Sequence, residues 1–243
     1  MDSANGSDPS ASPNRSLPPM TESLRHSDSE RHYTSLRGSV FEVLPDDVLR
    51  DVAGVVGEVR LLAGHMLYDP EVSVVADGLV RAFISNPTGR QLTVAYVRPG
   101  HSLALAHLAG RRFPTAFQAV EDTHLLVIGN DRTLDLQQAY PEFGWAAAQE
   151  LSLRLDELEG ELARLAFDSL RQRLAAHLLA LTSGHDDDPH PVRLSQLAAA
   201  TASSREVVHR NLRTFAAESS IDVGPDGVTV TDRARLRHHA NID

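Results

Sequence analysis

The sequence contains no cysteine, and all 23 of its basic side chains are arginine. Without cysteine the chain has no disulfide, no thiol nucleophile and no cysteine-ligated zinc or iron–sulfur centre. Without lysine it has neither a Schiff-base lysine nor a P-loop lysine. No Ser-His-Asp arrangement or pair of catalytic carboxylates stands out in their place. The sequence therefore predicts a protein that is not an enzyme.

Long hydrophobic runs are also missing. No stretch approaches the roughly 18 apolar residues of a membrane-spanning helix, and the first residues do not resemble a signal peptide. We therefore expect a cytoplasmic protein with no membrane partner. Its 243 residues, 42% of them hydrophobic, suffice for one large domain or two ordinary ones. The net charge of −10 argues against a uniformly basic coat for nucleic acid but leaves room for a local basic patch.

The first half of the chain divides into a polar tail and a segment rich in short strands. Residues 1–38 are rich in Ser, Pro, Asn and Asp and have few apolar side chains, which predicts a disordered tail. Residues 39–132 alternate short apolar stretches with glycine-bearing turns, a pattern typical of an antiparallel barrel or double-sheet jelly roll. A short helix over residues 44–56, with Pro45 in its first turn, is predicted to lead into it.

Residues 133–182 have the pattern of a long helix followed by a hinge. Leucines recur there at spacings of four, three, four and three, at Leu151, Leu155, Leu158, Leu162 and Leu165. This spacing is typical of a coiled-coil seam and predicts a dimer interface. An amphipathic helix that lies on its own domain is the alternative interpretation.

Residues 183–243 predict a DNA-binding domain that contains a helix, a tight turn and a second helix. The first helix covers 194–201, the second covers 205–215, and a β-hairpin follows at 221–232. On a helical wheel, Val208, Leu212 and Phe215 fall on one face of the second helix. The opposite face carries Arg205, Glu206, His209, Arg210 and Arg213.

The charge of this segment is opposite to that of the whole chain. Between residues 189 and 217 four arginines face a single acidic side chain, Glu206. A short arginine-faced helix fits the DNA major groove, where arginine binds guanine and glutamate accepts from cytosine. A solvated polar face is the alternative, with Glu206 bonded to Ser203 in a capping box. The local charge reversal favours DNA binding.

The run Ser-Arg-Glu-Val-Val-His-Arg at 204–210 resembles the recognition helix of the cyclic AMP receptor/FNR (Crp/Fnr) superfamily of bacterial transcription regulators. The similarity extends over about residues 40–232, through the turn glycines and the segment 165–179. It implies an α+β fold: an N-terminal cyclic-nucleotide-binding-type β-roll, a long dimerisation helix and a C-terminal winged helix-turn-helix.

The resemblance also implies how such a protein acts. A homodimer would bind double-stranded DNA at a pseudo-palindromic operator, with the hairpin 221–230 as a wing beside the backbone, and an activator would also contact RNA polymerase. The implied base contacts are Arg205, Glu206 and Arg210. The residues expected at the DNA backbone are Arg193, Ser195, Ser204, His209 and Arg213.

The effector site departs from the family pattern. In members that bind cyclic AMP, a Gly-Glu pair holds the ribose and an Arg-Ser pair holds the phosphate. Counted from Gly100, these places hold Ala104-Leu105 and Pro114-Thr115. We therefore predict that the usual contacts to cyclic AMP are lost. The effector pocket is expected at Leu105, Arg111, Arg112 and Thr115. A register shift could let Arg111 or Arg112 take the place of the phosphate-binding arginine.

No metal site or cofactor is predicted, but two hypotheses about the roll stay open. His101 and His107 lie in the altered segment and could bind heme or a metal, although surface or capping histidines are the interpretation we prefer. Alternatively the roll senses a small metabolite. A third hypothesis, for the whole chain, is a cupin-like metalloenzyme with a helical appendage. It would give the arginines on the exposed face of 205–213 no role.

Overall fold

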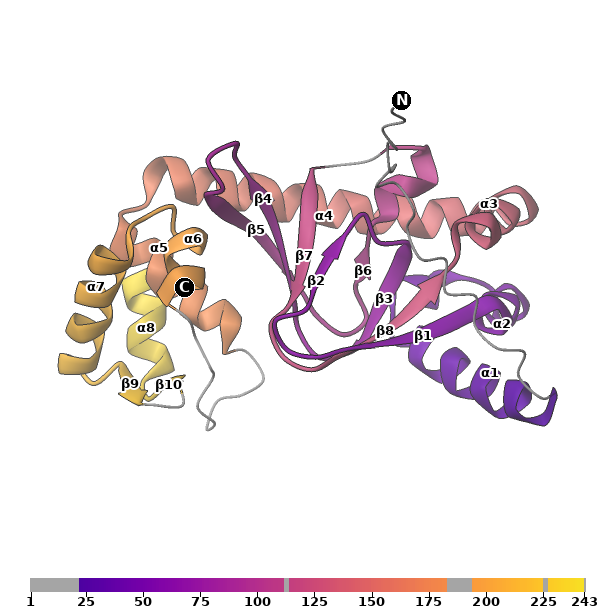
Figure 1. Cartoon of the computed structure of the whole chain (residues 1–243), viewed down its shortest axis with the longest axis horizontal. Helices are drawn as coiled ribbons and strands as arrows, with labels where there is room; N and C mark the ends of the chain where they lie inside the picture. Colours follow the sequence, from indigo (N-terminus) through magenta and orange to yellow (C-terminus); the bar gives the residue numbers. More distant parts are fainter. Residues whose placement is uncertain (1–21, 112–113, 183–193, 225–226, 243) are drawn as a thin grey trace, which may run out of the picture.

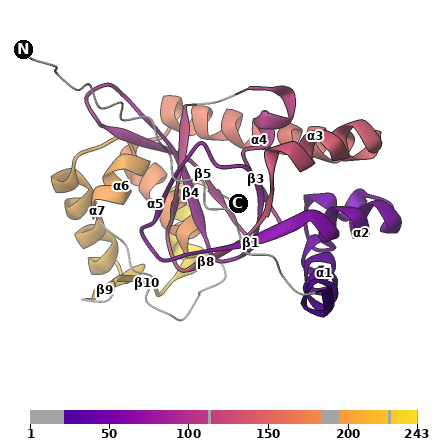
Figure 2. The same ribbon diagram turned by 45° about the vertical axis from the view of Figure 1, so that its right-hand side comes forward.

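The computed structural model describes residues 22–111, 114–182, 194–224 and 227–242. A β-roll occupies the middle of the molecule, and one long helix, α4, runs along the roll to a small helical domain that contains α5 to α8 (Figure 1). Helices α1 and α2 lie at the opposite end from that domain in both ribbon views (Figures 1 and 2). This arrangement confirms the predicted fold class: a β-roll, a long helix and a C-terminal winged helix-turn-helix.

The roll consists of two four-stranded sheets in which all neighbours are antiparallel. One sheet has the order β1-β8-β3-β6, and its strands are β1 (Val56–Leu61), β8 (Thr123–Ile128), β3 (Val72–Asp77) and β6 (Ser102–Leu103). The other has the order β2-β7-β4-β5, and its strands are β2 (Met66–Tyr68), β7 (Thr115–Ala119), β4 (Val80–Ser85) and β5 (Gln91–Val97). The apolar stretches at 72–75, 79–84, 92–97 and 125–128 predict β3, β4, β5 and β8, whereas the stretch at 60–63 overlaps only the end of β1. Strands β2, β6 and β7 were not predicted, because two to five residues are too few to show an alternating pattern.

Two of the predicted turns require glycine. Gly78 has a φ of +91°, and a Cβ there would lie 2.6 Å from the Asp122 carbonyl oxygen. Gly100 has a φ of +87°, and a Cβ there would lie 2.5 Å from the Gly38 carbonyl oxygen. Any other residue would add backbone strain to a steric clash at both corners of the roll.

The prediction of a disordered tail over residues 1–38 is wrong for its C-terminal part. Helix α1 (Glu22–Leu36) packs against α2 (Asp46–Val55), and Leu36 is fully buried. The buried His32 ring places Nε2 3.0 Å from Glu58 Oε1 on β1. A few apolar anchors and a polar contact thus order a segment whose overall composition is polar. Residues 1–21 lie outside the described part of the chain.

The short connection after α1 also differs in detail from the prediction. A 3-10 helix, η1 (Val40–Val43), precedes α2, and Pro45 is the N-cap residue of α2 and not part of its first turn. The ring of Phe41 in η1 stacks on Phe143, with centroids 4.9 Å apart and planes at 7°. This contact fixes the N-terminal end of α4 against the roll.

The segment 133–182 forms parts of three helices: α3 (Asn130–Ala139), α4 (Pro141–Phe167) and α5 (Leu170–Leu181). The first break falls at Tyr140, which has an extended backbone as expected before proline. The second falls at Asp168, where Ser169 and Gln172 begin α5 with a reciprocal capping box. The 27-residue α4 carries all five leucines of the predicted seam.

Helix α5 belongs with the C-terminal domain, although the prediction grouped it with the dimer helix and hinge. Its buried leucines share one core with α6 (Leu194–Ala200), α7 (Arg205–Ala217), the hairpin β9 (Ile221–Gly224) and β10 (Gly227–Val230), and α8 (Arg233–Ala240). Leu79 of the roll packs into the same core. The C-terminal domain therefore begins at Leu170 and rests directly on the roll.

Candidate DNA-binding interface

The turn between α6 and α7 is held by hydrogen bonds of its own. Thr201 is fully buried and its hydroxyl donates to the Leu197 carbonyl at 2.8 Å, while the Ser203 amide donates to the Ala198 carbonyl at 2.9 Å. Between them Ala202 adopts a left-handed backbone with a φ of +52°. The pattern of helix, tight turn and helix is therefore present as predicted, with an alanine in a conformation that favours glycine.

The N-cap of α7 is Ser204, not Ser203. Its hydroxyl accepts from the Val207 amide at 3.4 Å, so Val207 occupies the third helical position and Glu206 the second. The capping box between Ser203 and Glu206 is therefore wrong. The Glu206 carboxylate makes no hydrogen bond or ion pair with any described residue and is available to a ligand.

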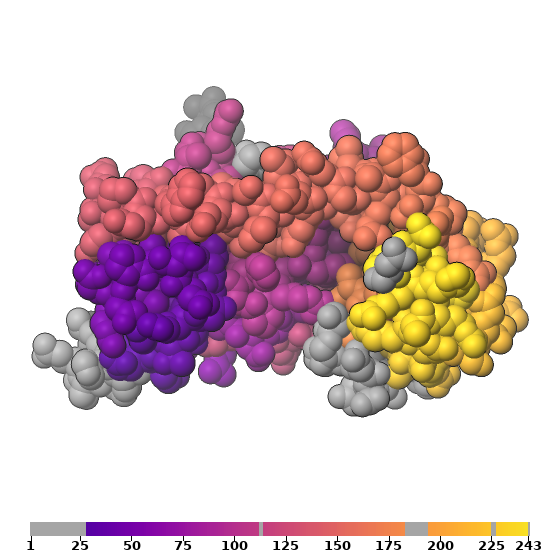
Figure 3. Space-filling model, turned by 180° about the vertical axis from the view of Figure 1, so that it is seen from behind, coloured from indigo at the N-terminus to yellow at the C-terminus, as the bar shows by residue number. Residues whose placement is uncertain are grey.

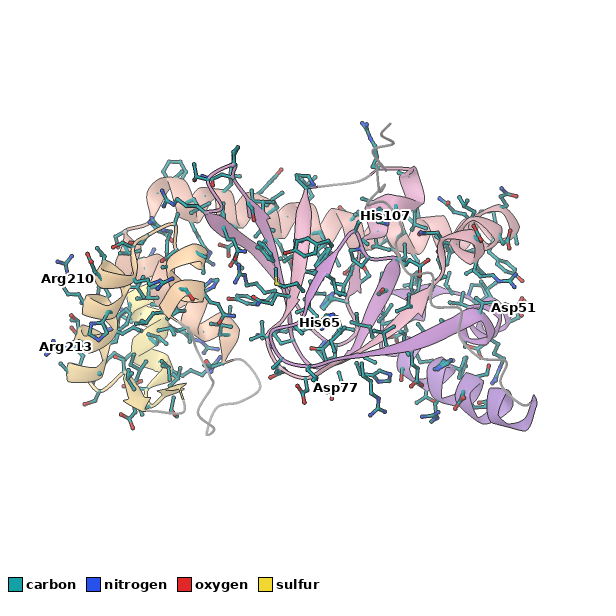
Figure 4. All side chains as sticks on the ribbon, viewed as in Figure 1. Asp51, His65, Asp77, His107, Arg210 and Arg213 are labelled. Atoms are coloured by element: carbon teal, nitrogen blue, oxygen red, sulfur yellow. The ribbon has the colours of Figure 1, made fainter. Side chains whose placement is uncertain are left out.

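The two faces of α7 divide as the helical wheel predicts. Val208 and Phe215 are fully buried and Leu212 nearly so, which anchors the helix in the domain core. The opposite face is exposed along its whole length and carries Arg205, Glu206, His209, Arg210 and Arg213. Figure 4 shows Arg210 and Arg213 projecting from the outer edge of the domain.

None of these five side chains makes a hydrogen bond or ion pair with the described residues. Their charges and donors are therefore uncommitted within the described chain. Ser195 on α6 is also exposed, beside the turn. Arg193, the remaining residue expected at the DNA backbone, lies outside the described residues.

The wing supplies a different kind of surface. Strands β9 and β10 pair from Ile221 with Val230 to Gly224 with Gly227, which confirms the predicted hairpin. Within the described strands the wing has no basic side chain, and its exposed residues include the acidic Asp222 and the apolar Val223. In the described part of this domain the basic side chains therefore lie on the helices and not on these strands.

The leucine seam of α4 lies on the surface of the single chain. Leu151, Leu155, Leu158 and Leu162 are between 41% and 62% exposed, and Leu165 is half-buried. These side chains leave a continuous apolar stripe in contact with water. Leu151 and Leu158 also line a cavity between α4 and the roll, so the alternative interpretation, an amphipathic helix that lies on its own domain, describes part of this stripe.

The roll contains a cavity of about 230 Å³ between its second sheet and α4. Leu105 and Thr115, two of the residues predicted for an effector pocket, line this cavity. Arg111 is exposed and does not line it, Pro114 is also exposed, and Arg112 lies outside the described residues. The sequence did not predict that α4 contributes Arg154 and Glu157 to the wall of this cavity. The charged residues between the leucines of the seam were the signal that could have indicated this contribution.

The basic side chains of this cavity lie near carboxylates, although the buried Nη2 atom of Arg154 has no hydrogen-bond partner among the described residues. Arg154 contacts Glu157 at 2.8 Å and Glu150 at 3.3 Å, and His107 Nε2 lies 3.1 Å from Asp69. The rest of the lining is mostly small and apolar. The lining of the cavity therefore suits a mostly apolar small ligand better than a phosphate group.

His101 and His107 do not form a shared ligand site. His101 Nδ1 lies 3.2 Å from Glu150 on α4, whereas His107 pairs with Asp69 before β3. No group of three or more His, Asp or Glu side chains suited to a metal ion occurs in the described residues. Each histidine thus has a structural partner from a different element. Likewise, no helix in the described ranges is long and apolar enough to cross a membrane.

Comparison with known proteins assigns the chain to a family. A model of the Crp-like helix-turn-helix domain matches residues 172–239. The cyclic AMP receptor protein of Thermus thermophilus is 35% identical over 179 residues, which are 73% of this chain and 80% of that protein. The chain belongs to the Crp/Fnr family. The transcriptional regulator SdrP of the same organism is 30% identical over 172 residues, or 68% of this chain and 82% of SdrP.

Solved structures of Crp/Fnr family members share the fold of this chain. A family member from Eubacterium rectale gives a TM-score of 0.71 at 19% identity, covering 83% of this chain and 97% of its own. A CRP/FNR-family transcriptional regulator from Thermus thermophilus gives 0.64 at 27% identity, covering 76% of this chain and 98% of its own. The protein is therefore a Crp-like transcription regulator with a helix-turn-helix DNA-binding domain.

Proposed function

We propose that this Crp/Fnr protein acts as a homodimer that reads a pseudo-palindromic operator through α7. The observation that carries the proposal is the exposed face of α7, whose three arginines and one glutamate have no partner among the described residues. Arg205, Glu206 and Arg210 contact base edges, because they lie in the first two turns of the helix. Ser195, Ser204, His209 and Arg213 contact the backbone; so does Arg193, which is assigned from the sequence alone.

The dimer forms along the leucine stripe of α4 in this proposal. Burial of exposed apolar area is the dominant favourable term in protein association. Two parallel copies of α4 would bring the two recognition helices to one side of the assembly. Successive major grooves lie about 34 Å apart, so the half-sites of the operator are spaced by about one helical turn.

We further propose that the roll does not hold cyclic AMP by the usual contacts. Leu105 cannot accept a hydrogen bond from the ribose, and the exposed Pro114 offers no guanidinium to a phosphate. The basic side chains that line the described cavity, Arg154 and His107, already face carboxylates. The name of the Thermus relative therefore does not carry over to this chain as a ligand assignment.

A small metabolite with an apolar body is the second candidate for the roll. It is favoured by the apolar lining of the 230 Å³ cavity. Heme is disfavoured, since His101 and His107 are held by carboxylates on separate elements. An absorption spectrum of the purified protein tests the heme hypothesis directly, because bound heme gives a Soret band.

The proposed function is tested by mapping the genomic sites that the protein occupies and measuring binding to the recovered sequence. We expect a pseudo-palindrome that shifts in a gel with one dimer bound per site. Loss of the shift in R205A and R210A, with unchanged unfolding temperature, is the expected control result. A recovered site without two-fold symmetry, or two variants that bind like the native chain, would contradict the proposal.

A further inference from the structure

The C-terminal domain rests on the outer face of the second sheet of the roll, the face that points away from the core of the roll. In Figures 1 and 3 this domain lies beside the roll, beneath the end of the helical band that α4 forms across it. Strand β5 contacts α6, and the side chain of Gln118 on β7 meets that of Gln196 on α6 at 3.4 Å. Since β4 lies between β7 and β5 in this sheet, it lies beneath the same contact.

Arg81 on β4 belongs to this outer face. Its neighbours along the strand, Val80 and Ala82, belong to the core of the roll, so Arg81 points the other way. Its register partners on the two adjacent strands are Gln118 and Tyr96, which contact α6 and α5 respectively. Arg81 is nevertheless only 2% exposed. The C-terminal domain therefore buries an arginine that the roll by itself would leave on its surface.

The charge of Arg81 has no counter-charge in the described part of the chain. Its two terminal nitrogens donate to neutral amides, to Gln91 Oε1 at 2.5 Å and to Gln118 Oε1 at 3.3 Å. The guanidinium also lies 4.5 Å from the centre of the Phe83 ring. No carboxylate of the described residues forms an ion pair with Arg81, and its buried Nε atom has no hydrogen-bond partner among them. Burial lowers the pKa of Arg81, against an opposing effect of Tyr96.

A buried guanidinium without a carboxylate destabilises the state that buries it. The amide oxygens and the aromatic ring offset part of the lost hydration of Arg81, but neutral groups do not replace a counter-charge. When the C-terminal domain moves away from the roll, water reaches the guanidinium again and this cost disappears. An apolar side chain of similar volume would carry no such cost in the docked state.

Apolar contacts hold the two domains together against this cost. Leu79, the residue before β4, is 2% exposed and packs into a core whose other buried members all belong to the C-terminal domain. Val120 and Tyr96 of the roll pack against the same core. The stability of the docked arrangement therefore depends on two opposing contributions that lie two residues apart, the apolar contact of Leu79 and the buried charge of Arg81.

We propose that Arg81 makes this docking reversible, because its buried charge favours a state in which the C-terminal domain has separated from the roll and both remain folded. The roll has buried clusters of its own that contain no residue of the C-terminal domain, so it does not need that domain for its core. Docking fixes the direction of α7 relative to α4. The spacing of the two recognition helices in the dimer would therefore depend on Arg81; this consequence rests on the proposed function, whereas the docking equilibrium does not.

Because the chain contains no cysteine, a single introduced thiol reports on docking without background. Leu79→Cys places the thiol beneath the C-terminal domain, and Val75→Cys places it in the core of the roll, where Val75 is fully buried. Each full-length variant is treated with a maleimide, and its rate is divided by the rate of the same variant unfolded in urea. We expect position 79 to react at least about tenfold faster than position 75, since separation of the domains leaves the roll folded.

Substitution of Arg81 in the Leu79→Cys chain tests the charge itself. Arg81→Met keeps much of the volume without the charge and should slow the reaction at position 79 about tenfold. Arg81→Gln also removes the charge and should slow it in the same direction. Arg60→Met removes an exposed arginine from β1 in the other sheet and is the matched control, which should leave the rate unchanged.

Three results would overturn the proposal. Equal rates at positions 79 and 75 would mean that the domains separate only when the roll unfolds. An unchanged or faster reaction in both Arg81 variants would mean that Arg81 holds the domains together through its amide contacts. Equal slowing by Arg60→Met would point to the net charge of the chain and not to Arg81. Circular dichroism shows whether each variant is folded; if Arg81→Met is not, Arg81→Gln and the comparison of positions 79 and 75 still decide.

Discussion

Tyr96 on β5 and His177 on α5 are joined by a 2.6 Å hydrogen bond across the boundary between the roll and the C-terminal domain. Their rings lie 4.9 Å apart at 51°. Burial lowers the pKa of His177 to about 3, and the nearby charge of Arg81 contributes in the same direction. Burial also raises the pKa of Tyr96. The tyrosine hydroxyl therefore donates to Nε2 of a neutral imidazole, and the domain contact depends on that neutral form.

This contact predicts an acid-sensitive fold. In the unfolded chain His177 titrates near its ordinary pKa of about 6.5, so below that pH the unfolded state binds a proton that the folded state rejects. The contribution of neutral His177 to stability is thus complete above about pH 6.5 and is lost progressively as the pH falls toward the folded pKa of about 3. The free energy of unfolding should fall between pH 7 and pH 5, measured by urea titration.

The variant His177→Gln isolates the effect, because glutamine can still accept from Tyr96 but does not titrate. We expect its free energy of unfolding to change less between those two pH values than that of the native chain. His238→Gln, at an exposed position on α8, is the control and should keep the native pH dependence. An equal decrease in H177Q and the native chain would show that other groups cause the acid sensitivity.

Ala202 provides a test of backbone strain in the helix-turn-helix. Its φ of +52° is left-handed, where a non-glycine residue costs about 1 kcal/mol or more. Ala202→Gly should therefore raise the free energy of unfolding by about 0.5–1 kcal/mol, net of the greater flexibility of glycine in the unfolded chain. Chemical denaturation of the two proteins measures this directly. A destabilised variant would mean that contacts of the Ala202 methyl group stabilise the fold by more than the left-handed backbone costs.

The contrast between α7 and α1 shows what local sequence can predict. The faces of α7 follow from periodicity, because Val208, Leu212 and Phe215 repeat at helical spacing and the arginines fill the other side. Helix α1 has no such pattern, and its order comes from His32 and Leu36 meeting partners far along the chain. The sequence alone therefore predicts the recognition surface but not this N-terminal helix.

The two cavities show the same limit. The sequence predicts Leu105 and Thr115 in the roll pocket, because both lie in one short segment. A second cleft, between the roll, α4 and the C-terminal domain, is lined by Arg98, Arg164 and Arg237, which are separated by tens of residues and brought together only by domain docking. Their spacing follows no helical or strand period. Such a site becomes visible only when the packing of the domains is known.

The leucine stripe of α4 predicts a dimer that one charge can disrupt. Leu155→Glu and Leu162→Glu should each shift the protein from dimer to monomer, because a carboxylate buried in an apolar seam is strongly disfavoured. Leu153→Glu is a matched control, since Leu153 is 57% exposed and Leu155 55%, but the two project from opposite sides of the helix. Light scattering coupled to size-exclusion chromatography gives the mass of each. A native chain that is already monomeric at micromolar concentration would contradict the predicted interface.

The altered roll predicts a negative result with cyclic AMP. The family resemblance puts Leu105 at the place of the ribose acceptor and Pro114 at the place of the phosphate-binding arginine, so we expect both polar contacts to be lost. Calorimetry at about pH 7 should therefore give no micromolar binding of cyclic AMP. Binding in that range would show that other groups, such as Arg111, replace the missing contacts.

The face of α7 predicts two distinguishable classes of DNA variant. Arg205→Ala should cost about 1–3 kcal/mol on the preferred operator and relax the preference at one base pair per half-site, as expected for a bidentate contact to guanine. Arg213→Ala should weaken binding to all sequences alike and reduce the slope of log K against log salt by about one for each phosphate that the variant no longer neutralises. Anisotropy titrations over a salt series, on the operator and on single-base variants, measure both effects, with Arg132→Ala as the control. If Arg205→Ala changed only the salt slope, or Arg213→Ala altered base preference, the assignment of these residues to bases and backbone would have to be reversed.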